Sequence, residues 1–200
     1  MIGDRSEKDQ VNESKNRVAS AIDGVGDVAA ALVDAVSDTV VHTLGGARAA
    51  QSEALGLLTD TVTGGVHAVA EVGGEVGSAA KSIMLGTLKG AQQVGTAGVE
   101  VVSYSAAALV KGAAETGGKV TDAARGALEG AVEGARDVGL TVEEATAAAT
   151  SGALGAAGEI SSRAAKEVGN VLTETISSAK GVVEEATGHA RRPARPGRKT

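Results

Sequence analysis

Apolar residues recur along most of this chain at steps of three, four and four residues. The series starts at Ile22 and keeps one phase to Val183, and Glu143 is the only charged residue at its positions. Steps of three and four place side chains on one face of an α-helix, whereas a strand needs a step of two. Eleven residues in three turns correspond to ~3.67 residues per turn, so this face runs almost straight. The spacing predicts amphipathic helix from about Arg17 to Gly188.

We expect this apolar face to be the surface through which the protein binds. Its larger residues are Ile22, Val25, Val33, Val36, Val40, Leu44, Leu55, Leu58, Val62, Val66, Val69, Met84, Leu88, Val99, Val102, Val110, Leu128, Val132, Leu154, Val168, Leu172, Ile176 and Val183. Since Val and Ala dominate the face, each side chain offers little area, and one helical segment would bind a surface weakly. Strong binding would need many linked segments.

Weak helix formers interrupt the apolar face every 22 residues. The predicted hinges are Gly73, Gly95, Gly117 and Gly139, and Gln51 and Ser161 continue the same series. A glycine inside a helix costs about 1 kcal/mol relative to alanine, so the helix should break most easily at these positions. After the last of these glycines, Thr141 and Glu144 have the spacing of a capping box, which predicts a helix start.

A longer repeat of 44 residues relates segments along the same region. The sequence GAQQVG at 90–95 matches GARDVG at 134–139, and AEVGGEV at 70–76 matches AETGGKV at 114–120. Such a fixed period is the signature of a repeat architecture, in which each copy is one structural unit. About four degenerate copies cover the apolar-periodic region.

These periods predict an all-α fold with three parts. Residues 18–188 should form an extended array of amphipathic helices, or the same helices folded into a loose bundle. The polar residues 1–17 and the basic residues 189–200 are predicted to be disordered tails.

The composition narrows the classes of protein that this chain can belong to. The chain has 29 Gly, one Tyr and no Phe, Trp or Cys, so we expect no deep globular core and no disulfide or thiolate metal site. A net charge of −6 argues against bulk nucleic-acid binding. The chain shows neither an apolar signal segment nor ~18 uninterrupted apolar residues, so no transmembrane span is predicted. We expect a cytoplasmic location, free or peripheral to a membrane or lipid body.

Three glycines at a spacing of four, Gly126, Gly130 and Gly134, lie in a charged segment. On a helical wheel they fall opposite the apolar face, as do Gly86 and Gly90. Two interpretations are open. The glycines either leave the free helix marginally stable, or they let a second helix approach closely in a bundle.

No group of residues in the sequence indicates catalysis, cofactor binding or metal binding. His42, His67 and His189 lack the spacing of metal ligands. The segment GVGDVA at 24–29 matches a dinucleotide-binding loop loosely but follows no predicted strand. We therefore predict a non-enzymatic protein without a cofactor.

Charges on the helical wheel favour a lipid interface as the partner. Acids such as Asp38 and Glu115 lie opposite the apolar face, whereas Lys81, Arg125 and Arg136 share one register at its border. There, their aliphatic stems can cover apolar surface while the charges reach water. Helices that lie in a membrane surface show this arrangement, and ordinary bundles show it too.

Eleven-residue amphipathic repeats rich in Ala, Gly, Val and Thr resemble those of perilipins, exchangeable apolipoproteins and group 3 late-embryogenesis-abundant proteins. The resemblance covers residues 18–187 and is one of pattern. It implies helices that fold on lipid, on drying or on self-association. This chain is less charged and more apolar than late-embryogenesis-abundant proteins, which favours a coat over a hydration protectant.

We therefore expect a non-enzymatic protein that coats a membrane, a lipid droplet or another hydrophobic surface through conditionally folded helices. Two alternatives are a protectant against desiccation stress and a self-associating helical scaffold. No specific nucleic acid is expected as a partner.

Overall fold

The computed structural model describes residues 28–45, 51–96 and 98–190. These residues form seven α-helices and no strand, so the predicted all-α class is confirmed. The helices are α2 (Val28–Gly45), α3 (Gln51–Glu71), α4 (Val76–Gln93), α5 (Val99–Glu115), α6 (Val120–Gly134), α7 (Val142–Ile160) and α8 (Ser162–Ala190). The predicted N-terminal tail lies outside the described residues, as does the C-terminal tail from residue 191 onward.

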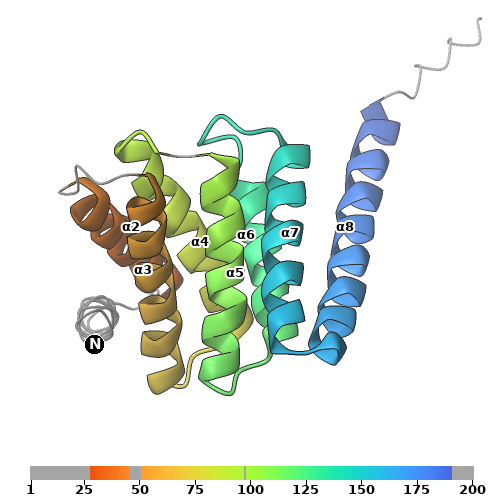
Figure 1. Cartoon of the computed structure of the whole chain (residues 1–200). Coiled ribbons are helices and arrows are strands. Elements are labelled where there is room, and N and C mark those ends of the chain that lie inside the picture. The colour runs from red at the N-terminus through yellow and green to blue at the C-terminus, as the bar shows by residue number, and fades with distance from the viewer. Residues whose placement is uncertain (1–27, 46–50, 97, 191–200) are drawn as a thin grey trace, which may run out of the picture.

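The helices stack in two layers, with consecutive helices running in opposite directions (Figure 1). We call α2, α4, α6 and α8 the even layer, and α3, α5 and α7 the odd layer, which faces the viewer in Figure 1. The most extensive contacts join α4 to α6, α5 to α7 and α2 to α4, which are neighbours within one layer. A 44-residue repeat is therefore one pair of helices, and successive pairs stack side by side as in helical-repeat proteins.

Four helix ends share one turn, spaced by 22 residues. Gly73, Gly95, Gly117 and Gly139 have φ of +72°, +74°, +73° and +75°. At each turn this glycine donates its N–H to the carbonyl three residues before it, and the next residue donates to the carbonyl five residues before itself. This is the Schellman pattern, which satisfies helix carbonyls and needs a left-handed residue. The structure therefore places all four predicted hinge glycines between helices.

The two remaining positions of the 22-residue series also lie at helix ends. Gln51 is the first residue of α3, and Ser161 separates α7 from α8. The Ser161 hydroxyl accepts the Ala164 N–H at 3.0 Å and so caps α8. The predicted capping box is confirmed, since the Thr141 hydroxyl accepts the Glu144 N–H at 3.2 Å and the Glu144 carboxylate accepts the Thr141 N–H at 2.9 Å.

The interior between the layers is one continuous apolar cluster. Its largest fully buried side chains include Leu58, Ile83, Met84, Leu109 and Leu128, and alanines fill much of the rest. The composition led us to expect no deep globular core, and the core that the described helices form is a thin one. Short Ala and Val side chains build a thin core because two layers of helices approach each other closely.

Candidate functional site

The apolar face lies mainly inside the protein, between the two layers. Its buried residues are Val36, Val40, Leu44, Leu58, Val62, Val66, Val69, Met84, Leu88, Val102, Val110, Leu128, Val168 and Leu172. Val33, Leu55, Val132, Leu154 and Ile176 are partly buried. Val99 is 43% exposed. Ile22, Val25 and the side chain of Val183 lie outside the described residues. In this folded state the face contacts other helices of the same chain.

A second buried face is made of glycines. Gly126, Gly130 and Gly134 of α6 are buried against α4, and Gly86 and Gly90 of α4 are buried against α2. The helical wheel placed all five opposite the apolar face, and the sequence left open whether they weaken the helix or admit a second helix. The structure buries all five against a neighbouring helix. Each helix in the middle of a layer has neighbours on both sides, so more than one face of it is buried.

The glycines set how closely the helices approach. A Cβ built on Gly130 would lie 2.7 Å from the Lys81 carbonyl oxygen and 2.8 Å from the Met84 Cβ. A Cβ on Gly90 would lie 2.7 Å from both the Ser37 carbonyl oxygen and the Val40 Cβ. These contacts are closer than real Cβ atoms tolerate, and half of them are with backbone that cannot rotate away. Close helix approach is therefore the interpretation of this glycine series that the structure supports.

Ion pairs join neighbouring helices within each layer. In the odd layer, His67 Nε2 lies 3.2 Å from Glu115 Oε2, and Lys111 Nζ lies 2.6 Å from Glu159 Oε2. The second pair follows the first by 44 residues at both positions. Glu115 and Glu159 stand at the C-terminal ends of α5 and α7, where the helix dipole disfavours an acid. The Lys111 ammonium group offsets this unfavourable interaction at Glu159, and the His67 ring supplies a hydrogen-bond partner at Glu115.

The even layer has two ion pairs that do not follow the repeat. Lys89 Nζ lies 2.8 Å from Asp34 Oδ1, and Lys81 Nζ lies 2.7 Å from Glu133 Oε2. The hydrogen bond from each lysine to its carboxylate raises the pKa of the ammonium group. All four side chains are more than a third exposed, so these pairs align the helices but contribute little stability.

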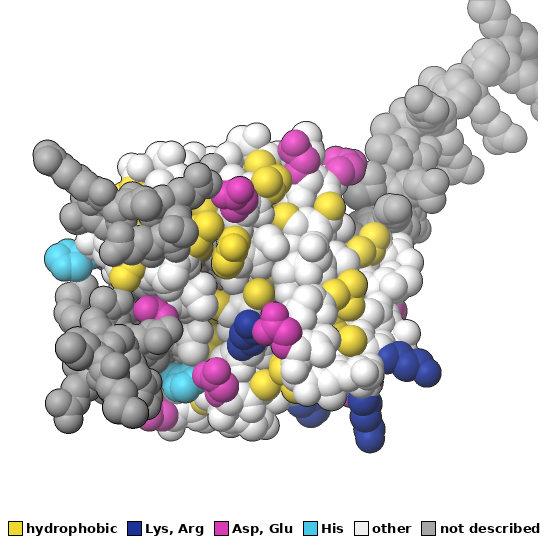
Figure 2. Space-filling view, viewed as in Figure 1, with side chains coloured by type: hydrophobic (Ala, Val, Ile, Leu, Met, Phe, Trp, Pro, Cys, Tyr) yellow, Lys and Arg dark blue, Asp and Glu magenta, His cyan; other side chains and the backbone are white. Residues whose placement is uncertain are grey.

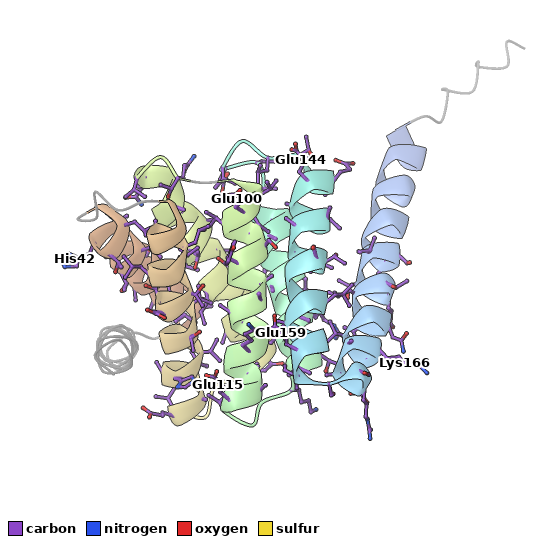
Figure 3. The ribbon with its side chains drawn as sticks, in the orientation of Figure 1. His42, Glu100, Glu115, Glu144, Glu159 and Lys166 are labelled. Atoms are coloured by element: carbon purple, nitrogen blue, oxygen red, sulfur yellow. The ribbon has the colours of Figure 1, made fainter. Side chains whose placement is uncertain are left out.

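On the outer face of the odd layer, one basic and one acidic side chain lie side by side in the lower middle (Figure 2). Figure 3 labels Glu159, the partner of Lys111, in this part of the face, and other acids lie toward its two rims. Figure 3 shows Glu100 and Glu144 at the upper ends of α5 and α7, and Glu115 near the lower end of α5. Between the rims the exposed positions include Tyr104, which is 50% exposed. Between the rims, the described residues of this face are mostly small side chains.

The titratable residues singled out in the sequence are dispersed. His42 is exposed, His67 belongs to the odd-layer ion pair, and the side chain of His189 lies outside the described residues. Backbone and hydroxyl hydrogen bonds from Thr141 lower the pKa of Glu144, which therefore serves its helix cap. Among the described residues, no three His, Asp or Glu side chains come together as a possible metal site.

No helix in the described part of the chain combines the length and the apolarity that crossing a bilayer requires. The first four residues of the loosely matching GVGDVA segment, 24–27, lie outside the described residues, and its last two begin α2.

The sequence analysis did not identify the ion pairs, and it left open whether the glycine ridge is buried. Both left a signal. His67 and Lys111 are 44 residues apart, as are Glu115 and Glu159. The glycines recur every four residues, which is the spacing of one ridge on a helix surface. A helical wheel could not decide between the two interpretations of that ridge, because it considers one helix with one partner.

No protein-family model and no curated protein sequence matches this chain.

Proposed function

We propose that this protein is a non-enzymatic helical scaffold whose apolar face forms its own core. The main support is the glycine packing. A helix spread alone on a lipid surface gains nothing from Gly126, Gly130 and Gly134, and each costs about 1 kcal/mol relative to alanine. Against α4, Gly126 and Gly130 permit a backbone approach that a side chain at either position would obstruct. The sequence thus favours a packed stack over isolated helices.

The layered arrangement suits a scaffold for a second reason. Each helix pair contacts chiefly the pairs beside it, so the stack presents an extended outer surface that repeats with the sequence. Such surfaces hold partners in register along the stack. In this proposal the protein positions its partners through the shape of this surface, and no bound cofactor or metal is needed.

A surface coat is the second candidate, and the turns favour it. A Cβ on Gly73, Gly95, Gly117 or Gly139 would meet no atom within 4 Å, so these four glycines lie away from the packed interior. Helices joined at such positions can separate without breaking any helix. The buried apolar face would then become available to lipid, as the sequence resemblance implies.

Circular dichroism and amide hydrogen exchange distinguish these candidates. The full chain is measured in dilute buffer, with anionic and zwitterionic phospholipid vesicles, with oil droplets, and after drying. For a scaffold we expect strong helical signal and slow exchange in the buried parts of α4, α5 and α6 in plain buffer, and neither should change with lipid. Leu128→Asp should abolish both, whereas the control Ile160→Asp, at a position 42% exposed, should preserve them.

Other outcomes contradict the scaffold. Helix that forms only with vesicles or droplets supports the coat, and vesicle binding should then weaken in Leu128→Asp. Helix that forms only on drying supports the desiccation protectant.

A further inference from the structure

One side of α3 is buried although none of the described helices lies beside it there in the odd layer. Thr61 is 1% and Ala68 is 0% exposed on this side, and Gly64 between them is also buried. The described helices that contact α3 are α5, on its other side in the odd layer, and α2 and α4 of the even layer. Figure 1 shows α3 as the outermost described helix of the odd layer.

The 44-residue repeat shows which kind of element covers this side. The equivalent residues of the other two odd-layer helices are also buried, and they are Ser105, Ala108 and Gly112 in α5, and Ala149, Gly152 and Ala156 in α7. There the cover is the preceding helix of the odd layer. A Cβ built on Gly112 would lie 3.2 Å from the Val66 Cβ of α3, and one on Gly152 would meet the Ser103 backbone of α5. The covered side of α3 therefore has the position of an interface with one more helix.

The cover must come from this chain, because the structure holds a single chain, and from residues outside the described part. Residues 46–50 are too short. They enter α3 at Gln51, and Ala68 lies about 25 Å further along the helix, whereas five residues span at most ~18 Å. Residues 191–200 follow α8, which stands at the other end of the stack (Figure 1). Residue 97 joins α4 to α5. Residues 1–27, which directly precede α2, remain.

The sequence of this N-terminal segment fits the position. A shift of 44 residues aligns residues 7–27 with Gln51–Glu71, which is the whole of α3. The shift places Val11, Val18, Ile22 and Val25 at the positions of Leu55, Val62, Val66 and Val69. The last three of these α3 residues are at most 4% exposed. The segment therefore continues the apolar spacing that the odd-layer helices bury.

The rest of the segment is polar. Between residues 7 and 17 only Val11 is apolar. A helix at the end of a stack has one side without a neighbour, and that side must be polar. At the other end of the stack α8 meets the same requirement, with exposed Arg163, Lys166 and Glu167.

We propose that residues 7–27 contain a further helix of the odd layer, which packs on the buried side of α3 and pairs with α2. Ile22 then lies on Ala68, as Val66 lies on Gly112. This helix would extend the predicted helical region, which starts at about Arg17, toward residue 7. It keeps the small residues of α3 from contacting other chains. The inference goes beyond the scaffold function but requires the same packed stack.

Disulfide formation in the full chain tests this contact, since the wild type has no Cys. The test variant carries Ile22→Cys and Ala68→Cys. The positive control carries Val66→Cys and Gly112→Cys, at positions whose Cβ atoms are close enough for a disulfide. The negative control carries Ile22→Cys and Gly56→Cys, because Gly56 is exposed and lies about 18 Å from Ala68 along α3. Under mild oxidation at low protein concentration, the first two variants should form a disulfide within one chain and the third should not.

Thiol labelling gives an independent readout. The cysteine of Ala68→Cys should react slowly, and adding Ile22→Asp should accelerate its labelling by at least about ten-fold because the cover is displaced. Ala156→Cys is the matched control, since the described helix α5 covers this equivalent position of α7. Its labelling rate should not change with Ile22→Asp, which excludes global unfolding as the cause.

Three other outcomes contradict the inference. If the Val66–Gly112 disulfide forms and the Ile22–Ala68 disulfide does not, the proposed helix is wrong and the scaffold stands. A disulfide from position 22 to position 68 between two chains would assign the cover to a second copy. If neither disulfide forms and the chain has no helix in plain buffer, the scaffold is contradicted together with this inference.

Discussion

The middle of the stack and its C-terminal end are stabilised in different ways. Helices α4, α5 and α6 begin without a side-chain cap, and glycine contacts hold α4 and α6 tightly to a helix of the same layer. Helices α7 and α8 both begin with a side-chain cap, from Thr141 and Ser161. Each has an exposed outer side, and α8 contacts α7 more extensively than it contacts α6. Helices α4 to α6 are therefore held mainly by contacts with neighbouring helices, whereas α7 and α8 depend more on local interactions at their own starts.

This difference shows how one sequence pattern produces two environments. The apolar face continues in phase from α2 into α8. What changes is the number of neighbours that a helix has. A helix flanked on both sides buries its glycine ridge, whereas a terminal helix exposes its outer side.

The largest expected loss of stability comes from removing a large core side chain in the middle of the stack. Leu128 of α6 is 2% exposed, and Leu128→Ala should lower the free energy of unfolding by about 3 kcal/mol. Ile176 of α8 is only partly buried, so Ile176→Ala should cost about 1 kcal/mol. Urea denaturation of both variants measures the difference. Equal losses would show that the end is packed as firmly as the middle.

Two glycine-to-alanine substitutions should change the free energy of unfolding by smaller amounts and in opposite directions. Gly126 lies against the Gly77 backbone, so Gly126→Ala must push α6 away from α4 and should destabilise by about 2 kcal/mol. Gly155→Ala adds its methyl group in open space and should stabilise the protein by up to about 1 kcal/mol. Thermal unfolding at low protein concentration compares the two. Stabilisation by Gly126→Ala would contradict the close approach of α4 and α6.

The smallest expected change in stability comes from removing the N-terminal cap of α7. Thr141→Ala removes a hydroxyl that accepts from the helix N-terminus and should cost about 1 kcal/mol. Because the folded pKa of Glu144 lies below its unfolded value, its contribution is present above pH ~4.3 and is lost as pH falls through the folded pKa.

A pH series of thermal melts tests this contribution. Glu144→Ala should be less stable than the wild type near neutral pH, and the difference should narrow on acidification. Glu129→Ala is the comparison variant, because Glu129 is an exposed helical acid for which no cap interaction is described. A gap for Glu144→Ala that is constant with pH would exclude the capping carboxylate as its source.

Much of the secondary structure followed from the sequence because the relevant physics is local. The three-and-four spacing indicated helix, and the glycines at 22-residue intervals lie at turns that only a left-handed residue closes without strain. The capping box was visible for the same reason, since its two residues are neighbours in the chain. The 44-residue repeat predicted one structural unit per copy, and the structure shows that this unit is a pair of helices.

The candidate binding face could not be assigned from the sequence. An amphipathic face has the same pattern whether it lies on lipid or against another helix, because both environments exclude water. Val36 and Leu128 therefore fit the predicted surface contact and the observed core equally well. Nor could the sequence show that Gly126 and Gly90 are buried, because that depends on a helix more than 40 residues away.

The sequence by itself determined the helices, their ends and the period at which they repeat, since each depends on residues within a few turns of one another. The tertiary structure decided which faces meet. It placed the apolar face between two layers, buried the glycine ridges within a layer and left the edge of α7 open. These outcomes depend on how many neighbours each helix acquires, and the stacking order of distant segments sets that number.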